Sequence, residues 1–366
     1  MVTSPRSAGP SFNCQPPHPK RYNPCIGLIG CGGISEQHLR AYQKAGYRVI
    51  ALCDINLPSA EQRRDEFFPQ AEVMTDYRRL LDNKEIEVVD ITTHPEDRVA
   101  LIGDSLDAGK HVLSQKPFVL DLEVGERLVD LARRRKVLLA VNQNGRWAPH
   151  FMYLRQAAHA GLLGALSSAD FLVSWDHNWT AGTPFDRIRH LILYDFAIHW
   201  FDIALTFFGK EQPEKVSASM RVARGQRSRP ALLAHALVDF RHAQATFSFN
   251  GNTLLDTHDQ TRLVGDQGVA FSQGPSLQKQ QVSLATSDGT VCPRLKGAWF
   301  PDGFAGAMGE LLCAIEEGRE PSHSAKDNLR SLAVCFAAIA SAEEGMPRIP
   351  GQVRSIEGAG KMTPRR

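Results

Sequence analysis

Asp195 and His199 are the residues in this sequence best suited to moving a proton. They stand four positions apart in a segment of helical character, so we expect them on one face of a helix, one turn apart. Histidine exchanges protons near neutral pH, and a carboxylate one turn away can orient its ring. The alternative is an ordinary helical Asp/His pair in which Asp202 serves packing or capping. The pair has no convincing third ligand, so no metal site is expected.

Lys116 adds a positive charge at a place where open α/β proteins bind ligands. It follows the apolar run His111–Leu113, within Ser114-Gln115-Lys116-Pro117. An ammonium at the carboxyl end of a parallel strand can bind and polarise a hydroxyl group. Lysines at strand ends are more often solvated, so Lys116 alone is a weak signal. Pro117 raises the question of a cis bond before it.

A glycine cluster follows the first apolar run and opens the first helical segment. It reads Gly-Cys-Gly-Gly-Ile-Ser over Gly30–Ser35. Gly30 suits a tight turn, and Gly32 suits the close approach of a pyrophosphate, which would lie at the helix N-terminus. A glycine-rich turn without a ligand is the alternative.

Asp54 strengthens the dinucleotide interpretation of that cluster. It ends the second apolar run, about 20 positions after Gly32, where a carboxylate accepts hydrogen bonds from the adenosine ribose. A carboxylate there repels a 2′-phosphate, so we expect NAD rather than NADP, although Arg63 or Arg64 could compensate. The alternative is that Asp54 only caps the helix that follows.

The elements expected to position these residues alternate between strands and helices. Such alternation indicates a parallel sheet covered on both faces. The predicted strands are Cys25–Ile29, Val49–Cys53, Val88–Ile91, His111–Leu113 and Val137–Val141. Beyond about residue 165 the runs alternate between polar and apolar residues, as at 231–241 and 244–250, which predicts an antiparallel sheet. Helices are expected at about 190–208, 302–317 and 326–344.

The fold class is therefore α/β, with a doubly wound Rossmann-type sheet followed by an α+β domain that has a large, mainly antiparallel sheet. An open face of that size must be covered, so we expect a homodimer or a homotetramer. The expected segments are a flexible arm (1–24), a dinucleotide-binding domain (25–147), a substrate-binding and oligomerisation domain (148–350) and a tail (351–366).

Composition excludes several classes of protein. The chain has 366 residues, 43% hydrophobic and 22% charged, which is typical of a globular protein. A net charge of +2 gives no basic excess for nucleic acid or an anionic membrane. No apolar run approaches the ~18 residues that cross a bilayer. Seven scattered cysteines and the lack of a secretory signal favour the cytoplasm.

Taken together, these residues resemble the glucose-fructose oxidoreductase / inositol dehydrogenase / MocA (Gfo/Idh/MocA) family of nicotinamide-dependent oxidoreductases, over about residues 25–347. The matching pieces are Gly30–Ser35, Asp54, Ala108–Leu113 leading into Gln115-Lys116-Pro117, Gly161–Gly164 and Asp195–Asp202. The sequence departs from the family pattern twice. Gln115 stands where Glu is usual, and Arg98 stands where His is usual.

The resemblance implies catalytic roles for Lys116, Asp195 and His199. A substrate CH–OH group would give its hydride to the nicotinamide while His199 takes the hydroxyl proton, Lys116 stabilises the alkoxide and Asp195 orients both. The substrate would be a sugar, a cyclitol or a related polyol. The expected cofactor contacts are Gly30, Gly32, Gly33, Ile34, Asp54, Thr93, Gln115, Lys116 and Asn142. Candidate substrate contacts are Arg146, Trp147, Trp179, Arg187 and His190.

Two other functions stay open at this point. Tightly held NAD could be reduced and reoxidised within one cycle, as in oxidoreductive glycoside cleavage or sugar–sugar transfer. A non-catalytic NAD-binding regulator is the second, although the presence of Lys116 and His199 argues against it.

Overall fold

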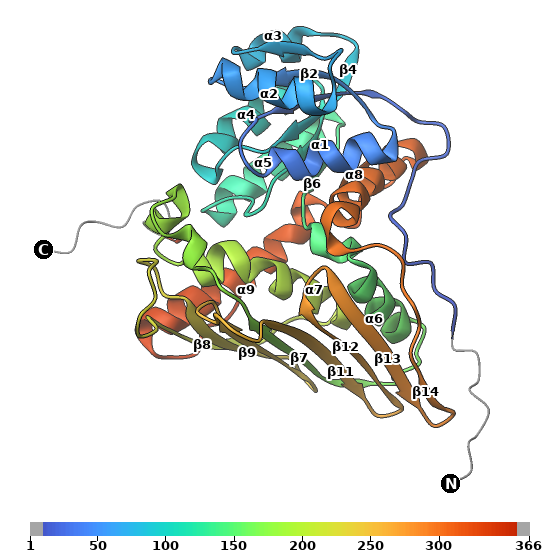
Figure 1. The fold of residues 1–366 in the computed structure, drawn as a ribbon, viewed down its shortest axis with the longest axis vertical. Helices are drawn as coiled ribbons and strands as arrows, with labels where there is room; N and C mark the ends of the chain where they lie inside the picture. Colours follow the sequence, from blue (N-terminus) through green and yellow to red (C-terminus); the bar gives the residue numbers. More distant parts are fainter. Residues whose placement is uncertain (1–9, 357–366) are drawn as a thin grey trace, which may run out of the picture. The chain divides into compact units, whose positions relative to one another are not determined.

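The computed structural model describes residues 10–356, and these fall into two compact units. The N-terminal unit comprises Gln15–Trp147 and Trp299–Leu329. The C-terminal unit comprises 10–14, Ala148–Ala298 and 330–356. The sequence analysis placed 299–329 in the second domain, but in the structure this segment packs with the first (Figure 1).

A six-stranded parallel sheet forms the N-terminal unit, in the order β3-β2-β1-β4-β5-β6. The sheet is doubly wound, and its strand order reverses between β1 and β4, the place where such sheets bind ligands. Its strands are β1 (Cys25–Ile29), β2 (Arg48–Cys53), β3 (Glu72–Met74), β4 (Ile86–Ile91), β5 (His111–Ser114) and β6 (Leu139–Val141). Every residue of β1 is buried, as expected for a strand covered on both faces.

Helices connect these strands, and their ends follow from local sequence. Gly46, at φ +73°, ends α1 and donates to Gln43 O. Asp121 caps α5 by accepting from Glu123 N at 2.7 Å. The helices are α1 (Ser35–Ala45), α2 (Leu57–Phe67), α3 (Tyr77–Asp82), α4 (Pro95–Asp107), α5 (Leu122–Arg135), the 3₁₀ turn η1 (Asn144–Trp147) and α8 (Trp299–Glu317).

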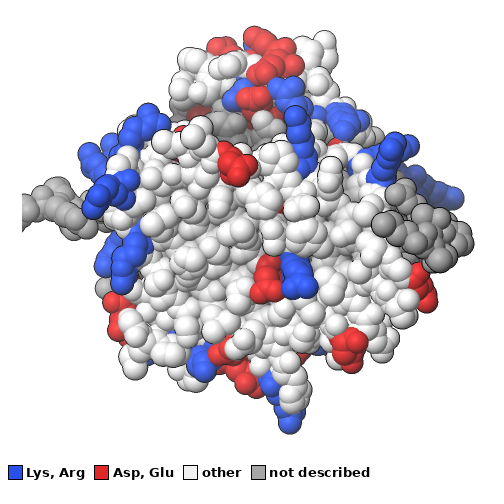
Figure 2. Space-filling model, turned by 60° about the horizontal axis from the view of Figure 1, so that its bottom comes forward, with Lys and Arg blue, Asp and Glu red and all other residues white. Residues whose placement is uncertain are grey.

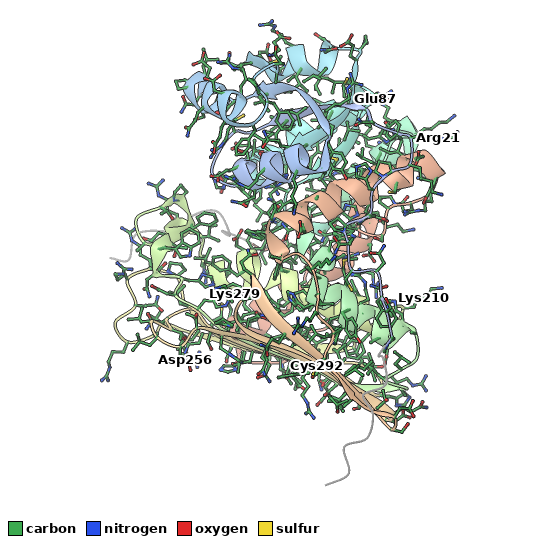
Figure 3. The ribbon with its side chains drawn as sticks, turned by 45° about the vertical axis from the view of Figure 1, so that its right-hand side comes forward. Arg21, Glu87, Lys210, Asp256, Lys279 and Cys292 are labelled. Atoms are coloured by element: carbon green, nitrogen blue, oxygen red, sulfur yellow. The ribbon has the colours of Figure 1, made fainter. Side chains whose placement is uncertain are left out.

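Part of the predicted flexible arm is anchored to this unit. The backbone N–H groups of Lys20, Arg21 and Tyr22 donate to the Glu316 carboxylate of α8 at 2.8, 2.6 and 3.0 Å. Figure 3 labels Arg21 and also Glu87 of β4, whose carboxylate accepts from the Tyr22 hydroxyl at 3.1 Å. Because the Glu316 carboxylate, far away in sequence, accepts from three successive N–H groups, it holds residues 20–22 against α8. Residues 1–9 of the arm and 357–366 of the tail lie outside the described residues.

An eight-stranded sheet forms the C-terminal unit, in the order β14-β13-β12-β11-β7-β10-β9-β8. Adjacent strands in this sheet pair antiparallel, except for β7 and β10. These two run parallel, with Phe171 opposite Phe247. The strands are β7 (Leu166–Ser174), β8 (Lys215–Arg221), β9 (Leu233–Asp239), β10 (Gln244–Asn250), β11 (His258–Gly265), β12 (Gly268–Ser276), β13 (Lys279–Thr286) and β14 (Gly289–Val291).

One face of this sheet packs under helices. Burial alternates along the strands, so that Ala245, Phe247 and Phe249 of β10 are buried while the residues between them are not. Above this face lie α6 (Pro149–His159), α7 (Ile198–Phe208) and α9 (Ala325–Glu344) (Figure 1). The 3₁₀ turns η2 (Asn178–Thr180) and η3 (Pro184–Arg187) and the π turn η4 (Ile192–Phe196) precede α7.

Across residues 10–356, no helix is both long and apolar enough to cross a membrane. In the same range, no three side chains among His, Cys, Asp and Glu group together as metal ligands would.

Candidate functional site

The glycine loop after β1 is built against the end of β4. Gly30 has φ +99°, and its N–H donates to Cys53 O at 2.8 Å. A Cβ on Gly30 would lie 2.9 Å from Thr93 Cγ2 and 3.0 Å from Thr93 N. Only glycine fits here, because both the backbone angle and the contact exclude a side chain. The loop therefore meets Thr93 at the switch point of the sheet.

The next two glycines face open space. A Cβ on Gly32 or Gly33 would have no atom within 4 Å. The N-cap position of α1, Ile34, provides no side-chain hydrogen bond to the first turn. Uncapped N–H groups at a helix start, beside glycines that leave room, form a good site for a phosphate. Thr93 Oγ1 is buried and has no hydrogen-bond partner in the described part of the chain, so the loop also offers a polar contact.

Asp54 ties the end of β2 to this loop. Its Oδ2 accepts from Cys31 N at 2.6 Å, and its Oδ1 accepts from Asn56 N at 2.8 Å. The carboxylate thus lies at the loop, as the spacing predicts. The two arginines that could neutralise a 2′-phosphate already face carboxylates. Arg63 contacts Glu66 (2.9 Å) and Glu36 (3.8 Å), and Arg64 contacts Asp65 (2.8 Å).

Lys116 follows β5 at the same carboxyl edge of the sheet, and the Lys116–Pro117 bond is cis. Arg98 of α4, only 1% exposed, holds this segment from behind. Its guanidinium donates to the carbonyl oxygens of Gln115, Pro117 and Thr93. The arginine that replaces the usual histidine therefore braces the backbone on both sides of Lys116.

A buried polar cluster behind Lys116 escaped the sequence analysis. It contains His38 and Tyr42 of α1 and Asp90 of β4, all fully buried. It also contains Gln115 and Asn142, which the sequence analysis placed only in the cofactor site. The signal was present in the sequence, since His38 lies on the apolar side of its helix and Asp90 interrupts an apolar strand.

Asp195 and His199 lie in the C-terminal unit at the junction of η4 and α7. The junction is not a regular α-helix, because Ala197 N donates to Ile192 O at 2.9 Å, five positions back. Asp195 therefore lies in a π turn and His199 in the α-helix that follows it, and their common face stays a prediction. A π turn changes the direction of side chains on either side of it and is frequent at functional sites. Asp195 is 7% exposed.

His199 lies at the edge of an aromatic cluster. Its ring lies 6.3 Å from Trp200, nearly perpendicular to it, and Trp200 contacts Trp175 (5.3 Å) and Phe249 (5.5 Å). His177 stacks on Phe196 at 4.0 Å in the same unit, and burial lowers the pKa of His177 to about 4. His199 itself is partly exposed, whereas Trp200 is buried.

The candidate substrate residues have different environments. Trp179 is 51% exposed and Arg187 is exposed. His190 is buried, with its Nε2 3.3 Å from Glu343 of α9, and burial lowers its pKa to about 4. In the N-terminal unit, Arg146 forms an ion pair with Asp327 at 2.7 Å.

Trp147 packs its ring edgewise against His323 at 4.8 Å. A Cβ on Gly306 would lie 2.3 Å from Trp147 Cγ, so α8 approaches the indole closely. Trp147 and Arg146 therefore contact residues of their own unit, and their role in substrate binding stays a prediction.

These features define a class of protein. A doubly wound parallel sheet with an open glycine loop, a carboxylate at the end of the second strand and a strand-end lysine, joined to a unit with a broad antiparallel sheet, is the architecture of a two-domain nicotinamide-dependent oxidoreductase. A family model described as "Oxidoreductase family, NAD-binding Rossmann fold" matches residues 25–143, and one described as "GFO/IDH/MocA C-terminal domain" matches residues 151–271. The chain belongs to the Gfo/Idh/MocA family of oxidoreductases.

Named relatives agree with this membership. The chain is 26% identical to an inositol 2-dehydrogenase of Rhizobium meliloti over 87% of this chain and 97% of that protein. It is 27% identical to a D-apiose dehydrogenase of Paraburkholderia graminis, covering 87% of each. An oxidoreductase from Agrobacterium radiobacter, crystallised with NAD+, L-tartaric acid and magnesium, has the same fold (TM-score 0.82, 21% identity, 90% and 99% covered).

Proposed function

We propose that this protein is an NAD-dependent dehydrogenase that takes a hydride from a CH–OH group of a sugar, a cyclitol or a related polyol. The main support for the proposal is that the open glycine loop and Lys116, whose backbone Arg98 holds, lie at the same edge of the parallel sheet. Relatives named for inositol and D-apiose support a polyhydroxylated substrate.

The N-terminal unit supplies the residues that would hold the dinucleotide. Gly32, Gly33 and the N-terminus of α1 receive the pyrophosphate, with Ile34 at the helix start. Asp54 accepts from the ribose hydroxyls, and the Thr93 hydroxyl is available beside Gly30. The nicotinamide, when bound, accepts the hydride. NAD is favoured over NADP because Asp54 repels a 2′-phosphate while Arg63 and Arg64 already face carboxylates.

Three side chains carry the chemistry of the substrate. His199 takes the hydroxyl proton at its ring nitrogen, Lys116 stabilises the negative charge that develops on the oxygen, and Asp195 orients the imidazole and the substrate.

The test is a substrate panel followed by a variant of Lys116. The pure protein is mixed with NAD, and separately with NADP, against aldoses, cyclitols, sugar acids and glycosides, while reduced-nicotinamide absorbance is recorded. We expect one polyol class to react with NAD. Consumption of a glycoside without net NADH would instead favour redox-neutral catalysis, and binding of NAD without turnover would favour a regulator.

Lys116→Met should lower kcat/KM for the active polyol about 100-fold or more, because an electrostatic stabiliser of the transition state is removed. The matched control is Lys110→Met, at the other end of β5. Lys110 Nζ donates to Asn83 O and Ile86 O at 2.8 and 2.7 Å, so this variant should lose stability and keep kcat/KM. Unchanged turnover in Lys116→Met would contradict the mechanism.

A further inference from the structure

A continuous chain of buried hydrogen bonds runs from β4 to the backbone of Lys116. His38 Nδ1 lies 2.7 Å from Asp90 Oδ2. His38 Nε2 lies 3.1 Å from Gln115 Nε2 and 3.0 Å from Asn142 Nδ2. All the side chains that form it are at most 4% exposed. Because the chain is dry, each hydrogen bond in it is strong and its geometry is well defined.

The partners fix which ring nitrogen carries the proton. The amide nitrogens of Gln115 and Asn142 only donate, so His38 Nε2 must accept from them. His38 Nδ1 then carries the hydrogen and donates to Asp90. The Tyr42 hydroxyl also donates to Asp90 Oδ2, at 2.6 Å, so the carboxylate has two donors. A second proton on His38 would point an N–H at two other N–H groups, which is repulsive.

Among residues 10–356, Asp90 is the carboxylate that contacts His38, and the Phe304 ring of α8 covers the imidazole at a centroid distance of 4.9 Å. The neutral Nδ1–H ring is therefore the form that satisfies every contact of His38.

Gln115 connects His38 to the backbone of Lys116. Its Nε2 donates to His38, and its Oε1 accepts from Lys116 N at 2.7 Å. The amide is thus held at both ends and cannot rotate without breaking one of the two contacts. Arg98 holds the carbonyl oxygens of Gln115 and Pro117 on the other side of the backbone. The backbone that bears Lys116 is fixed from two directions.

We propose that His38, locked as the neutral Nδ1–H tautomer between Asp90 and Gln115, is a positioning residue that sets the backbone at Lys116. The glutamine is essential to this arrangement, because a carboxylate at position 115 would accept from His38 Nε2 and draw a second proton onto the ring. The catalytic consequence rests on the proposed function, whereas the tautomer does not.

The first test reads the tautomer directly. Nitrogen-15 NMR of histidine-labelled, NAD-saturated full-length protein is recorded, and the signals absent from His38→Asn identify the ring. We expect Nδ1 protonated and Nε2 unprotonated in the native protein, and both nitrogens protonated in Gln115→Glu. An Nε2–H tautomer or a doubly protonated ring in the native protein would overturn the proposal, whatever the substrate.

The second test reads the positioning. At saturating NAD, His38→Asn should lower kcat about tenfold, because the displaced lysine no longer stabilises the negative charge that develops on the substrate oxygen. His111→Asn is the matched control, since its ring accepts from Leu138 N at 3.0 Å at the far end of β5, and it should keep kcat. If His38→Asn does not fold, Gln115→Leu, which removes both amide contacts, replaces it. Native kcat in a folded variant would contradict the positioning role.

Discussion

At the scale of single residues, we propose that Asp54 selects between the two dinucleotides. Its carboxylate is fixed by Cys31 N and Asn56 N, so the negative charge stays at the loop. Asp54→Asn keeps an oxygen for Cys31 N but removes the charge. The Kd for NADP should fall relative to the Kd for NAD, changing their ratio about tenfold, which is ~1.4 kcal/mol. Titration of the two dinucleotides by fluorescence measures both constants without a substrate.

The control for this variant is Asp65→Asn. Asp65 is exposed and contacts Arg64 at 2.8 Å, so its substitution removes the same charge from the same unit. Its ratio of Kd values should match that of the native protein. If Asp54→Asn left the ratio of the two Kd values unchanged, the role of Asp54 would be limited to its hydrogen bonds with the loop backbone.

Some residue contacts could be predicted from the sequence and others could not. Gly30 and Asp54 were predictable because a fixed spacing after an apolar run constrains both. Arg98 was visible only as a substitution for the usual histidine, since its carbonyl contacts depend on how α4 packs behind β5. The role of His38 was also not predictable, because it depends on hydrogen bonds to Gln115 and Asp90 that only the folded structure brings together.

At the scale of elements, strands were predicted better than irregular turns. The first run coincides with β1, and the second differs from β2 by one residue, because apolar residues that fill a buried strand are contiguous in sequence. The helix expected over 190–208 is a π turn followed by α7. The spacing of apolar residues indicates a helix, but it does not show that one backbone N–H will bond to the carbonyl five residues back rather than four. The parallel pairing of β7 with β10 was also hidden, since both pairings give the same alternation.

The inner face of β11 contains a buried carboxyl group that makes the stability of the fold depend on pH. Asp259 is fully buried there, and burial raises the pKa of its carboxyl to about 8. In the unfolded chain the pKa is about 3.9, so between about pH 4 and pH 8 the folded protein holds one more proton than the unfolded chain. This group therefore makes the free energy of unfolding fall as pH rises through that window.

Asp259→Asn should remove that contribution. The difference in unfolding free energy between variant and native protein, measured in urea at several pH values from 5 to 8, should grow in favour of the variant as pH rises. Asp288→Asn is the control, because Asp288 is exposed in the turn between β13 and β14 and should give a difference that does not change with pH. A constant difference for Asp259→Asn would show that the carboxyl is ionised throughout.

At the scale of the whole molecule, the outer face of the eight-stranded sheet has few charges. Figure 2 shows this broad face, mostly white, with acidic and basic atoms side by side near its middle. Register places Asp170 of β7 opposite Arg262 of β11, and Leu172 of β7 next to them along the strand. Leu237 of β9 and Phe271 of β12 lie on the same side as Leu172 and are partly exposed. A face of this size with so little charge is typical of a surface that a second subunit covers.

We therefore expect a homodimer or a homotetramer joined through this face, with a mass in solution of two or four times 40.5 kDa. Leu172→Glu should shift it toward a single chain, because a two-fold interface buries each substitution twice and leaves carboxylates without partners. Light scattering after size exclusion at micromolar concentration measures the mass. Leu255→Glu, at a leucine that is 85% exposed outside the strands, should leave the native mass unchanged. A native protein that elutes as a monomer would mean that this sheet face is exposed to solvent in the working enzyme.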